Sequence, residues 1–301
     1  MRVAVTGASG FIGHALVLAL ARRGFGVRAA ARRELVVPPQ VDVVRHGDLT
    51  GPPIDWRPLI AGVDAVVHLA GIAHDSAPPE LHDHVNHIQT AGLARAARAA
   101  GVAQLVLVSS IHAQSGPTAD RILTARDEPR PSDGYGRSKL AAEHAVRASG
   151  VPHVILRPAL VYGRGVKGNL ATLQRIARLP VPLPFATLRN RRSLCALDAL
   201  VDAIELVLVR RRSDACFLVA DAAPIAVRDI LAALRRGLGR HPNLFAVPRP
   251  VLETSLRIAG RRALWDRIGR ELIVDPAPLI ALGWRARDSA AGLARIVTRS
   301  D

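Results

Sequence analysis

The pair Tyr135 and Lys139 has the residue types and the spacing of an acid–base site. Side chains four positions apart lie on one face of a helix, so the Lys139 ammonium is expected about 5 Å from the Tyr135 phenol. At an effective dielectric constant near 20, a charge at that distance contributes about 3 kcal/mol, which lowers a phenol pKa from about 10 toward 8. A phenol with such a pKa suits general acid–base catalysis. The hydroxyl of Ser110, at the end of an apolar run, can polarise the same substrate oxygen.

The rarity of these residue types in the chain favours a functional pair. A Tyr-x-x-x-Lys spacing is common by chance and usually marks an exposed helix pair. Lysine and arginine together number 41, yet Lys139 and Lys167 are the two lysines, and Tyr135 and Tyr162 are the two tyrosines. We therefore interpret Ser110, Tyr135 and Lys139 as candidate catalytic residues.

Three glycines at three-residue spacing predict a binding loop for a dinucleotide. Gly7, Gly10 and Gly13 follow a short apolar run at 2–6 and precede a helical pattern. In such loops the first glycine permits a tight turn, the second lets the backbone approach a pyrophosphate, and the third allows close packing of helix and strand. The N-terminus of the helix then faces the phosphates. The predicted cofactor site also includes the two residues between the last glycines, Phe11 and Ile12.

The residues after the next apolar run, 26–31, bear on which dinucleotide is bound. A site that prefers NAD(H) places an acidic residue there for the ribose hydroxyls, whereas this chain has Arg32 and Arg33. A guanidinium suits a 2′-phosphate, and a charged hydrogen bond of about 1.5–3 kcal/mol favours NADP(H) by about one to two decades. NADP(H) is the predicted cofactor and NAD(H) the alternative, because both arginines could instead be solvated surface charges. Asp48 and Leu49 are expected near the adenine.

Apolar runs that alternate with helical patterns predict an α/β fold, a doubly wound parallel sheet of the Rossmann type. The runs lie at 2–6, 26–31, 41–45, 63–69, 104–109 and 153–157, and the helical patterns at 80–100 and 135–149. We expect a dinucleotide-binding domain over 1–160, to which 193–210 returns, and a smaller α/β substrate-binding domain over most of 161–301. The segment 112–134 is predicted to be a long loop, and 249–270 to be helical.

The composition argues against several classes of function. The 301 residues, 49% of them apolar, can bury a large core. The net charge of +16 would suit a nucleic-acid partner, but the arginines are spread along the chain, so we expect none. No stretch reaches the roughly 18 apolar residues of a spanning helix, and the first residues do not read as a signal peptide. We expect a cytoplasmic protein without stable membrane insertion.

Three closely spaced histidines, His82, His84 and His87, raise the question of a metal site. Two of them, His84 and His87, would share a helical face. A cluster of carboxylates or cysteines that could complete a ligand set is missing from this part of the sequence. We therefore interpret all three as histidines on a helix surface and predict no metal site.

With these motifs, the sequence resembles the extended short-chain dehydrogenase/reductase family over essentially its whole length. Ser110, Tyr135 and Lys139 match the family's catalytic triad, and the three glycines match its cofactor loop. The tetrapeptide His-Leu-Ala-Gly at 68–71 and Asn86 resemble its fourth-strand motif and following helix. The resemblance therefore implies that the cofactor also contacts Leu69, Ala70, Gly71, Asn86, Tyr135 and Lys139.

Within the family, the segments 160–169, 182–184 and 190–198 resemble bacterial UDP-N-acetylhexosamine 4-reductases of surface-polysaccharide synthesis. UDP-glucose 4-epimerases share much of this pattern. The resemblance implies a UDP-linked nucleotide sugar as substrate, with Asn169 and Arg191 near its phosphates and Arg192 as a competitor of Arg191. A guanidinium suits phosphate because it can donate two parallel hydrogen bonds. The resemblance also suggests a possible homodimer.

Two departures from the family pattern separate the possible functions. After Ser110 the chain reads Ile-His-Ala-Gln, without the Val-Tyr-Gly of typical epimerases, and the second strand lacks its acidic residue. Both favour an NADPH-dependent reductase of a UDP-4-keto-6-deoxy-N-acetylhexosamine over a UDP-hexose 4-epimerase that retains NAD. A non-catalytic NADP-sensing regulator on the same fold is the alternative of another class. The presence of the Tyr135–Lys139 pair argues against it.

Overall fold

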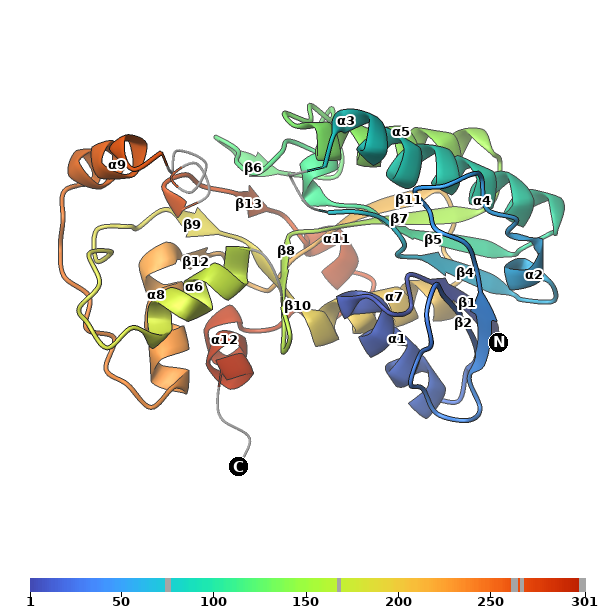
Figure 1. Ribbon diagram of the computed structural model, residues 1–301, viewed down its shortest axis with the longest axis horizontal. Coiled ribbons are helices and arrows are strands. Elements are labelled where there is room, and N and C mark those ends of the chain that lie inside the picture. Colours follow the sequence, from blue (N-terminus) through green and yellow to red (C-terminus); the bar gives the residue numbers. More distant parts are fainter. Residues whose placement is uncertain (74–76, 167–168, 261–264, 266–267, 298–301) are drawn as a thin grey trace. The chain divides into compact units, whose positions relative to one another are not determined.

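The computed structural model describes residues 1–73, 77–166, 169–260, 265 and 268–297 (Figure 1). The chain divides into two compact units. Unit 1 comprises 1–116, 125–158 and 200–218, and unit 2 comprises 117–124, 159–199 and 219–301. The segment that returns to unit 1 after residue 160 is thus 200–218, and a short piece of the predicted long loop, 117–124, belongs to unit 2.

Unit 1 is built on a seven-stranded sheet in the order β11-β7-β5-β4-β1-β2-β3. Its strands are β1 (Arg2–Thr6), β2 (Gly26–Ala31), β3 (Asp42–Arg45), β4 (Ala65–His68), β5 (Gln104–Val108), β7 (His153–Pro158) and β11 (Ala215–Val219). From β7 to β3 all neighbours pair in parallel, and Val3 lies between Val27 and Ala65. The predicted doubly wound sheet of the Rossmann type is confirmed.

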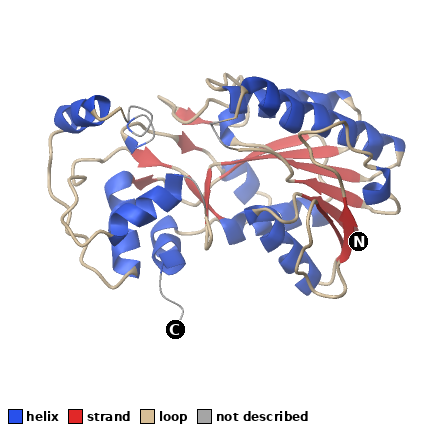
Figure 2. Cartoon of the chain, in the orientation of Figure 1, coloured by secondary structure: helices blue, strands red, loops and turns tan. Residues whose placement is uncertain are grey.

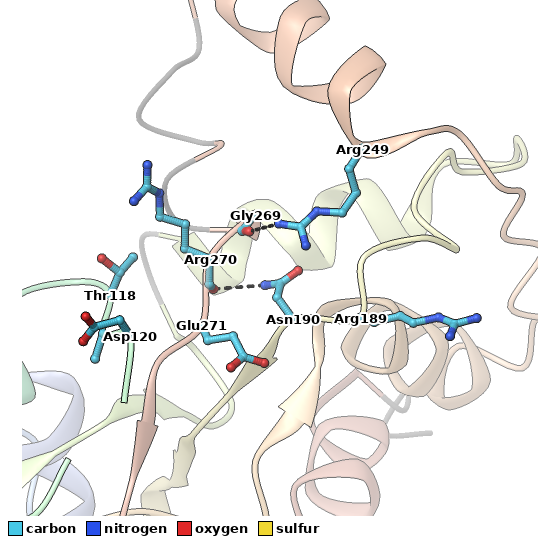
Figure 3. A pocket seen from close by; sticks show the side chains of 9 residues that line it. Thr118, Asp120, Arg189, Asn190, Arg249, Gly269, Arg270 and Glu271 are labelled. Atoms are coloured by element: carbon cyan, nitrogen blue, oxygen red, sulfur yellow. Dashed lines mark hydrogen bonds between the residues drawn. The ribbon is translucent and has the colours of Figure 1, made fainter. Parts of the chain in front are cut away.

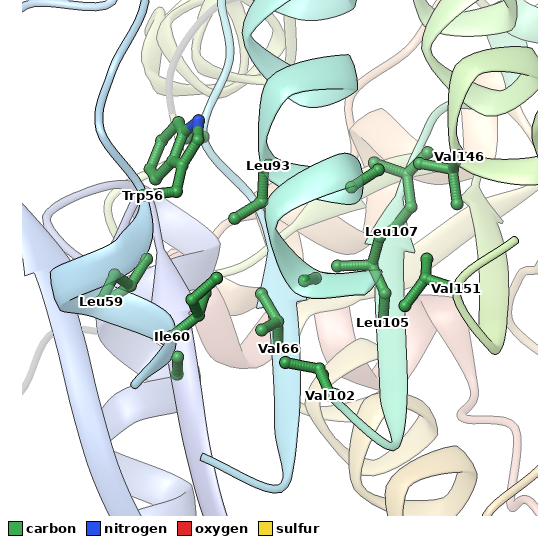
Figure 4. Packing of buried hydrophobic residues seen from close by; sticks show 14 of the residues in the cluster. Trp56, Leu59, Ile60, Val66, Leu93, Val102, Leu105, Leu107, Val146 and Val151 are labelled. Carbon is green, nitrogen blue, oxygen red and sulfur yellow. The ribbon is translucent and has the colours of Figure 1, made fainter. Parts of the chain in front are cut away.

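Helices cover both faces of this sheet, as the buried apolar strands require. In Figures 1 and 2, α1 (Phe11–Arg22) and α7 (Leu197–Val209) lie on one face, and α4 (Gln89–Ala99) and α5 (Gly134–Ala148) on the other. Short α2 (Arg57–Ile60), α3 (Pro79–His82) and a π-helical segment (Asp83–Ile88) precede α4. The core under α4 and α5 includes Trp56, Leu93, Leu105 and Val146 (Figure 4). Each such buried side chain contributes about 1.5–3 kcal/mol.

Unit 2 contains short paired strands and helices. Its strand pairs are β8 (Leu160–Tyr162) with β10 (Leu194–Ala196), β9 (Arg191–Arg192) with β12 (Ile225–Ala226), and β6 (Ile122–Leu123) with β13 (Ile273–Val274). Its helices are α6 (Asn169–Arg178), α8 (Val227–Gly237), α9 (Arg249–Ile258), α11 (Ala277–Ile280) and α12 (Ser289–Val297). The pairing of β6 with β13, together with a bridge between Arg192 and Leu272, brings 117–124, 189–192 and 269–274 together.

Two predicted segments differ in detail. The expected loop 112–134 begins in a 3-10 turn (Ile111–Ala113) and contains the strand β6, which forms because its partner β13 lies far away in the sequence. The expected helix over 249–270 is observed as α9, which stops at Ile258 before Gly260 in the left-handed region (φ +68°). Residues 261–264 and 266–267 lie outside the described part. Among the described helices, none is long and apolar enough to cross a membrane.

Candidate functional site

The glycine loop connects β1 to α1 in a geometry that needs glycine at two positions. Gly7 has φ +67°, and a Cβ added to it would lie 2.7 Å from the Ala70 backbone nitrogen. A Cβ on Gly13 would overlap the carbonyl oxygen of Gly7. The Gly10 N–H donates to that same carbonyl at 2.9 Å and closes the turn. The close approach of loop, helix and fourth-strand segment is the reason for the glycine spacing.

The N-terminus of α1 suits an anionic group. Its N-cap, Gly10, offers no side-chain acceptor, and the first turn contains no acidic residue. The backbone N–H groups of a first helical turn and the helix dipole favour a phosphate. The loop therefore fits the pyrophosphate of a dinucleotide, with Phe11 and Ile12 as the first helical residues.

A chain of hydrogen bonds holds the fourth-strand segment against this loop. The Thr6 hydroxyl accepts from the backbone N–H groups of Leu69 and Ala70, at 3.1 Å each, and bonds His68 Nδ1 at 2.7 Å. His68 Nε2 lies 2.8 Å from the hydroxyl of Thr90, which itself donates to a carbonyl. Nε2 therefore carries the proton and Nδ1 accepts. Burial lowers the pKa of His68 to about 3, so this imidazole stays neutral.

Asn86 connects the same segment to the helix that bears the candidate catalytic residues. Its Oδ1 accepts from the Ile72 N–H at 2.9 Å, and its Nδ2 donates to the Ile72 carbonyl and to Ser138 Oγ at 3.0 Å each. Asn86 is buried, and its amide is used in these contacts. A Cβ on Gly71 would lie 2.7 Å from Asn86 Oδ1, which explains the glycine. The resemblance implied that Asn86 contacts the cofactor. The contacts observed for its side chain hold the backbone of Ile72 and the hydroxyl of Ser138.

The two arginines after β2 differ in their surroundings. Arg32 Nη1 lies 3.1 Å from both carboxylate oxygens of Asp48, in an exposed ion pair. The pKa of Asp48 is lowered, first by hydrogen bonds from Thr50 and then by Arg32. Arg33 is exposed, and Leu49 is buried in the core of unit 1. A 2′-phosphate would therefore meet Arg33 and an Arg32 that Asp48 already neutralises in part.

Ser110 and Tyr135 come from two elements that Asp133 and His112 connect. Ser110 begins the 3-10 turn after β5, and its Oγ accepts from the His112 N–H at 3.2 Å. Asp133 caps α5 through the Gly136 N–H, which sets the start of the helix one residue before Tyr135. The Ser110 hydroxyl interacts with the Tyr135 phenol and favours its ionised form. The structure therefore brings these two candidate residues together.

The prediction that the pKa of Tyr135 is lowered is wrong. Burial raises the pKa of its phenol, and the nearby Asp133 carboxylate raises it further, against the Ser110 hydrogen bond. The ammonium of Lys139 is buried and donates to the Val108 carbonyl at 3.0 Å. Burial lowers the pKa of Lys139 to about 8. Helical spacing places these side chains on one face, but desolvation outweighs the attraction that the sequence suggested.

A buried ionic cluster lies next to Lys139 and was missed from the sequence. Glu143 is fully buried and accepts from Arg157 Nη2 at 2.5 Å, from Arg157 Nε at 2.9 Å and from Ser109 Oγ at 2.6 Å. Arg157 also donates to Gln114, and Arg147 lies 3.3 Å from Glu143. The cluster joins α5 to the strand ends β5 and β7. A signal existed, because Glu143 follows Lys139 by one helical turn on a face that is otherwise apolar.

His82, predicted to lie on a helix surface, is buried instead. Its ring packs against Tyr135, with 5.8 Å between the ring centroids, because α3 leads into a π-helical segment that turns this face inward. His84 Nε2 bonds the Gly51 carbonyl at 2.7 Å, and His87 Nδ1 bonds Asp83 at 2.9 Å. Each of the three histidines thus makes a contact within the protein: His82 with a ring, His84 with a carbonyl and His87 with a carboxylate.

The residues predicted to contact the substrate lie in unit 2. Arg191 is exposed, with its Nε 3.7 Å from Glu271 Oε1. Arg192 is buried and donates to the carbonyls of Arg270 and Pro117, and burial lowers its pKa to about 10. Its guanidinium therefore holds the short strands together. Asn169 is the first residue of α6, and its side chain lies outside the described part of the structure.

A cavity of about 740 Å³ lies beside these arginines within unit 2 (Figure 3). Its lining is Thr118, Ala119, Asp120, Arg189, Asn190, Arg249, Gly269, Arg270 and Glu271. Arg249 Nη2 donates to the Gly269 carbonyl at 2.7 Å, and its guanidinium lies over the Trp265 ring at 5.9 Å. Asn190 uses its amide nitrogen on two carbonyls, and its buried Oδ1 has no hydrogen-bond partner among the described residues. The wall is polar, with arginine as its main charged residue.

Comparison with known proteins gives the family. The sequence profile of the NAD dependent epimerase/dehydratase family matches residues 3–219. The chain belongs to this family. It is therefore an enzyme of the extended short-chain dehydrogenase/reductase type, which confirms the resemblance seen in the sequence.

The relatives of the chain have more than one kind of activity. It is similar to UDP-glucose 4-epimerase of Vibrio cholerae, with 30% identity over 94% of this chain and 90% of the relative. It is 34% identical to ceramide reductase of Caulobacter vibrioides, over 84% of this chain and 75% of that protein. Among solved structures, MoeE5 in complex with UDP-glucuronic acid and NAD superimposes with a TM-score of 0.78 and 26% identity, covering 99% of this chain and 98% of that chain.

Proposed function

We propose that this enzyme is an NADPH-dependent reductase that converts the 4-keto group of a UDP-4-keto-6-deoxy-N-acetylhexosamine into a hydroxyl. The observation that supports it most is the site in unit 1, where the Ser110 hydroxyl meets the Tyr135 phenol, with the buried ammonium of Lys139 one helical turn further along α5. Relatives that act on or bind UDP-sugars support the choice of substrate class.

The protein's own residues divide the work of carbonyl reduction. Bound NADPH would supply the hydride to the carbonyl carbon. Tyr135 donates its proton to the carbonyl oxygen as the C=O double bond opens, and Ser110 donates a hydrogen bond to the same oxygen. Lys139 stabilises the phenolate that remains and holds the nicotinamide ribose. A raised phenol pKa suits a donor, because the proton is present at neutral pH before the reaction.

The preference for NADPH over NADH rests on Arg32 and Arg33. The partial neutralisation of Arg32 by Asp48 lowers the attraction it offers, so Arg33 carries more of the proposed preference. NAD remains the alternative cofactor, as the family description and the NAD in a similar structure indicate for those proteins.

Substrate recognition is assigned to unit 2. We infer that Arg191, together with Asn169, contacts the diphosphate, and that the neighbouring cavity with Arg249 and Arg270 accepts the rest of the nucleotide. Arg192, the competing candidate, has both guanidinium ends on backbone carbonyls and is assigned a structural role. A bidentate arginine–phosphate contact is worth about 1.5–3 kcal/mol, so its loss should raise the apparent substrate constant roughly ten- to a hundred-fold.

A UDP-hexose 4-epimerase is the second candidate, because the relative from Vibrio cholerae carries that activity in its name. Mass spectrometry of the dinucleotide that stays bound through purification separates the two. A reductase is expected to be purified without a tightly held dinucleotide and to take up NADPH. NAD retained at one equivalent per chain would instead favour the epimerase, whose mechanism uses the same cofactor for oxidation and re-reduction.

Competition by free UDP tests the substrate class. UDP should inhibit the reduction of a UDP-4-keto sugar competitively, and Arg191→Ala should weaken both UDP and substrate with a smaller change in kcat, since the diphosphate lies away from the reacting carbon. Arg192→Ala should lower stability more than it changes the substrate constant. If UDP does not compete, the enzyme is a reductase of uncharged carbonyl compounds, as the similarity to ceramide reductase would allow.

A further inference from the structure

His112 lies between the two elements that carry Ser110 and Tyr135. It is the second residue of the 3-10 turn, and its backbone N–H donates to Ser110 Oγ at 3.2 Å. Its imidazole, with 26% of the side chain exposed, packs edge-on against the phenol ring of Tyr135, with 5.5 Å between the ring centroids. One residue therefore contacts both members of the proposed catalytic pair.

Asp133 connects the same turn to α5. Its Oδ1 accepts from the Gly136 N–H at 2.6 Å and caps the helix that carries Tyr135. Its Oδ2 accepts from His112 Nδ1 at 2.8 Å. Burial favours protonation of this carboxyl, but the bonds from His112 and Gly136 outweigh it and lower its pKa. An ionised acceptor fixes the proton on His112 Nδ1, and with it the orientation of the ring.

We propose that His112 and Asp133 form a clamp between the Ser110 turn and the first turn of α5, and that this clamp fixes the Ser110 hydroxyl relative to the Tyr135 phenol. His112 is then a positioning residue for the general acid step. The inference rests on the roles given to Ser110 and Tyr135 in the proposed function. It adds a residue pair to which neither the sequence motifs nor the family description assigns a role.

The clamp also determines which hydrogen bond Ser110 can make. Because Ser110 Oγ accepts from the His112 N–H, its own proton is left for an acceptor in front of it: the Tyr135 oxygen or a substrate carbonyl. A shift of the turn by a few tenths of an ångström would weaken the bond that Ser110 donates to an acceptor outside the turn. General acid catalysis requires donor and acceptor within hydrogen-bond reach, so the turn must be held in place.

The chain offers two matched controls for the clamp. His82, from α3, packs against Tyr135 at nearly the same ring distance, 5.8 Å, but it is not part of the Ser110 turn. His87 forms a comparable imidazole–carboxylate bond with Asp83, at 2.9 Å, on the surface of the π-helical segment. Replacement of His82 removes a ring contact with Tyr135 but leaves the clamp intact. Replacement of His87 removes an imidazole–carboxylate pair that is not part of the proposed site.

A test that needs no substrate uses the two tyrosines of the chain. With tyrosine labelled by carbon-13 at Cζ, an NMR spectrum at pH 8 contains one signal from Tyr135 and one from Tyr162, whose buried hydroxyl donates to Asp221. Ser110→Ala moves the Tyr135 signal by removing its hydrogen bond. His112→Ala also removes the ring that packs on Tyr135, so the comparison is made between His112→Ala and His112→Asn, which both lack that ring. The clamp predicts that the Tyr135 signals of these two variants differ, and that the difference disappears in the Ser110→Ala background. Tyr162 serves as the internal reference.

The conservative variants make this test specific. His112→Asn places an amide N–H near the position of Nδ1 and should keep the hydrogen bond to Asp133, whereas His112→Gln, which reaches the position of Nε2, should give a Tyr135 signal like that of His112→Ala. Asp133→Ser keeps an N-cap acceptor but removes the partner of His112, so it should move the Tyr135 signal although the His112 ring is retained. His87→Ala should leave the signal in place. Equal signals for His112→Asn and His112→Ala, or a difference between them that persists in the Ser110→Ala background, would overturn the clamp.

Steady-state kinetics on any carbonyl compound that the wild type reduces provides the second readout. His112→Ala should lower kcat by about ten-fold and change KM by less than about two-fold, because the aligned hydrogen bonds matter most in the transition state. His82→Ala should lower kcat less than His112→Ala does. Failure of UDP-sugars as substrates would leave the NMR result unaffected, so it would count against the proposed function alone. An unchanged kcat in His112→Ala would count against the clamp.

Discussion

At the scale of single residues, Tyr135 shows how environment overrides spacing. Its position four residues before Lys139 suggested a lowered pKa, yet burial and the Asp133 carboxylate raise it, and Lys139 bonds the Val108 carbonyl. A high pKa keeps the phenol protonated, as a proton donor in reduction must be. The Ser110 hydroxyl offsets part of this rise, because its hydrogen bond favours the phenolate.

The proposed cofactor preference also rests on individual side chains. Replacement of Arg32 and Arg33 together by alanine should weaken NADPH by about ten-fold or more and change NADH by less than about three-fold, since only NADPH carries the 2′-phosphate. Titration of each variant with both dinucleotides measures this. Arg33→Ala alone should account for most of the loss, because Asp48 partly neutralises Arg32. Equal losses for the two cofactors would mean that these arginines do not read the 2′-phosphate.

At the scale of elements, α5 combines three tasks along its length. Its first turn carries Tyr135 under the Asp133 cap, its second carries Lys139, and its third carries Glu143 in the ionic cluster with Arg157. This cluster connects the helix to the strands on which Ser110 is held. The orientation of the proposed catalytic residues therefore depends on a buried ion pair one turn further along the helix.

Removal of one partner of that ion pair should be costly. Glu143→Gln leaves the Arg157 guanidinium buried without a counter-charge, and we expect a loss of about 3–5 kcal/mol in the free energy of unfolding, measured with urea. Glu253→Gln is the matched control, because Glu253 forms a helical pair with Arg257 on an exposed face and should change stability by less than about 1 kcal/mol. Similar small losses for both variants would show that the buried pair is not a main support of α5.

The elements themselves were largely predictable, whereas the side-chain networks between them were not. Apolar runs gave the strands of the main sheet, and the glycine spacing gave the loop between β1 and α1, because both depend on local sequence. His112, Asp133 and Arg157 carry no local signal, since the partners that join them across the site lie 14 to 43 residues away and become neighbours through the fold. The burial of His82 depends on a π-helical segment, which no periodicity in the sequence indicates.

At the scale of the whole molecule, buried ionisable groups make stability depend on pH. The pKa of Lys139 is about 8 in the folded protein against an ordinary value of 10.5. Between these pH values the unfolded chain binds a proton that the folded chain does not. The contribution of Lys139 to the free energy of unfolding therefore rises with pH in this window. Below pH 8 the folded protein bears the full cost of the buried ammonium, at most about 3 kcal/mol.

Lys139→Met tests this linkage. The variant should be more stable than the wild type at pH 7.5 without cofactor, and the difference should shrink as the pH rises from 8 toward 10.5. Urea midpoints of both proteins at several pH values give the comparison, in which groups common to both, such as the Cys216 thiol with its pKa raised to about 11 by burial, cancel. A difference that is constant with pH would mean that the Lys139 ammonium is not disfavoured in the folded state.

The central claim is that Tyr135 supplies the proton for carbonyl reduction by a nicotinamide dinucleotide. Tyr135→Phe removes the phenol oxygen and little else, and its direct test is the rate of NADPH oxidation with a UDP-4-keto-6-deoxy-N-acetylhexosamine, measured beside NADPH affinity. We predict a loss of at least about a hundred-fold in kcat, as expected when general acid catalysis is removed, with NADPH affinity within about three-fold of the wild type. A variant that turns over at nearly the wild-type rate would contradict the account.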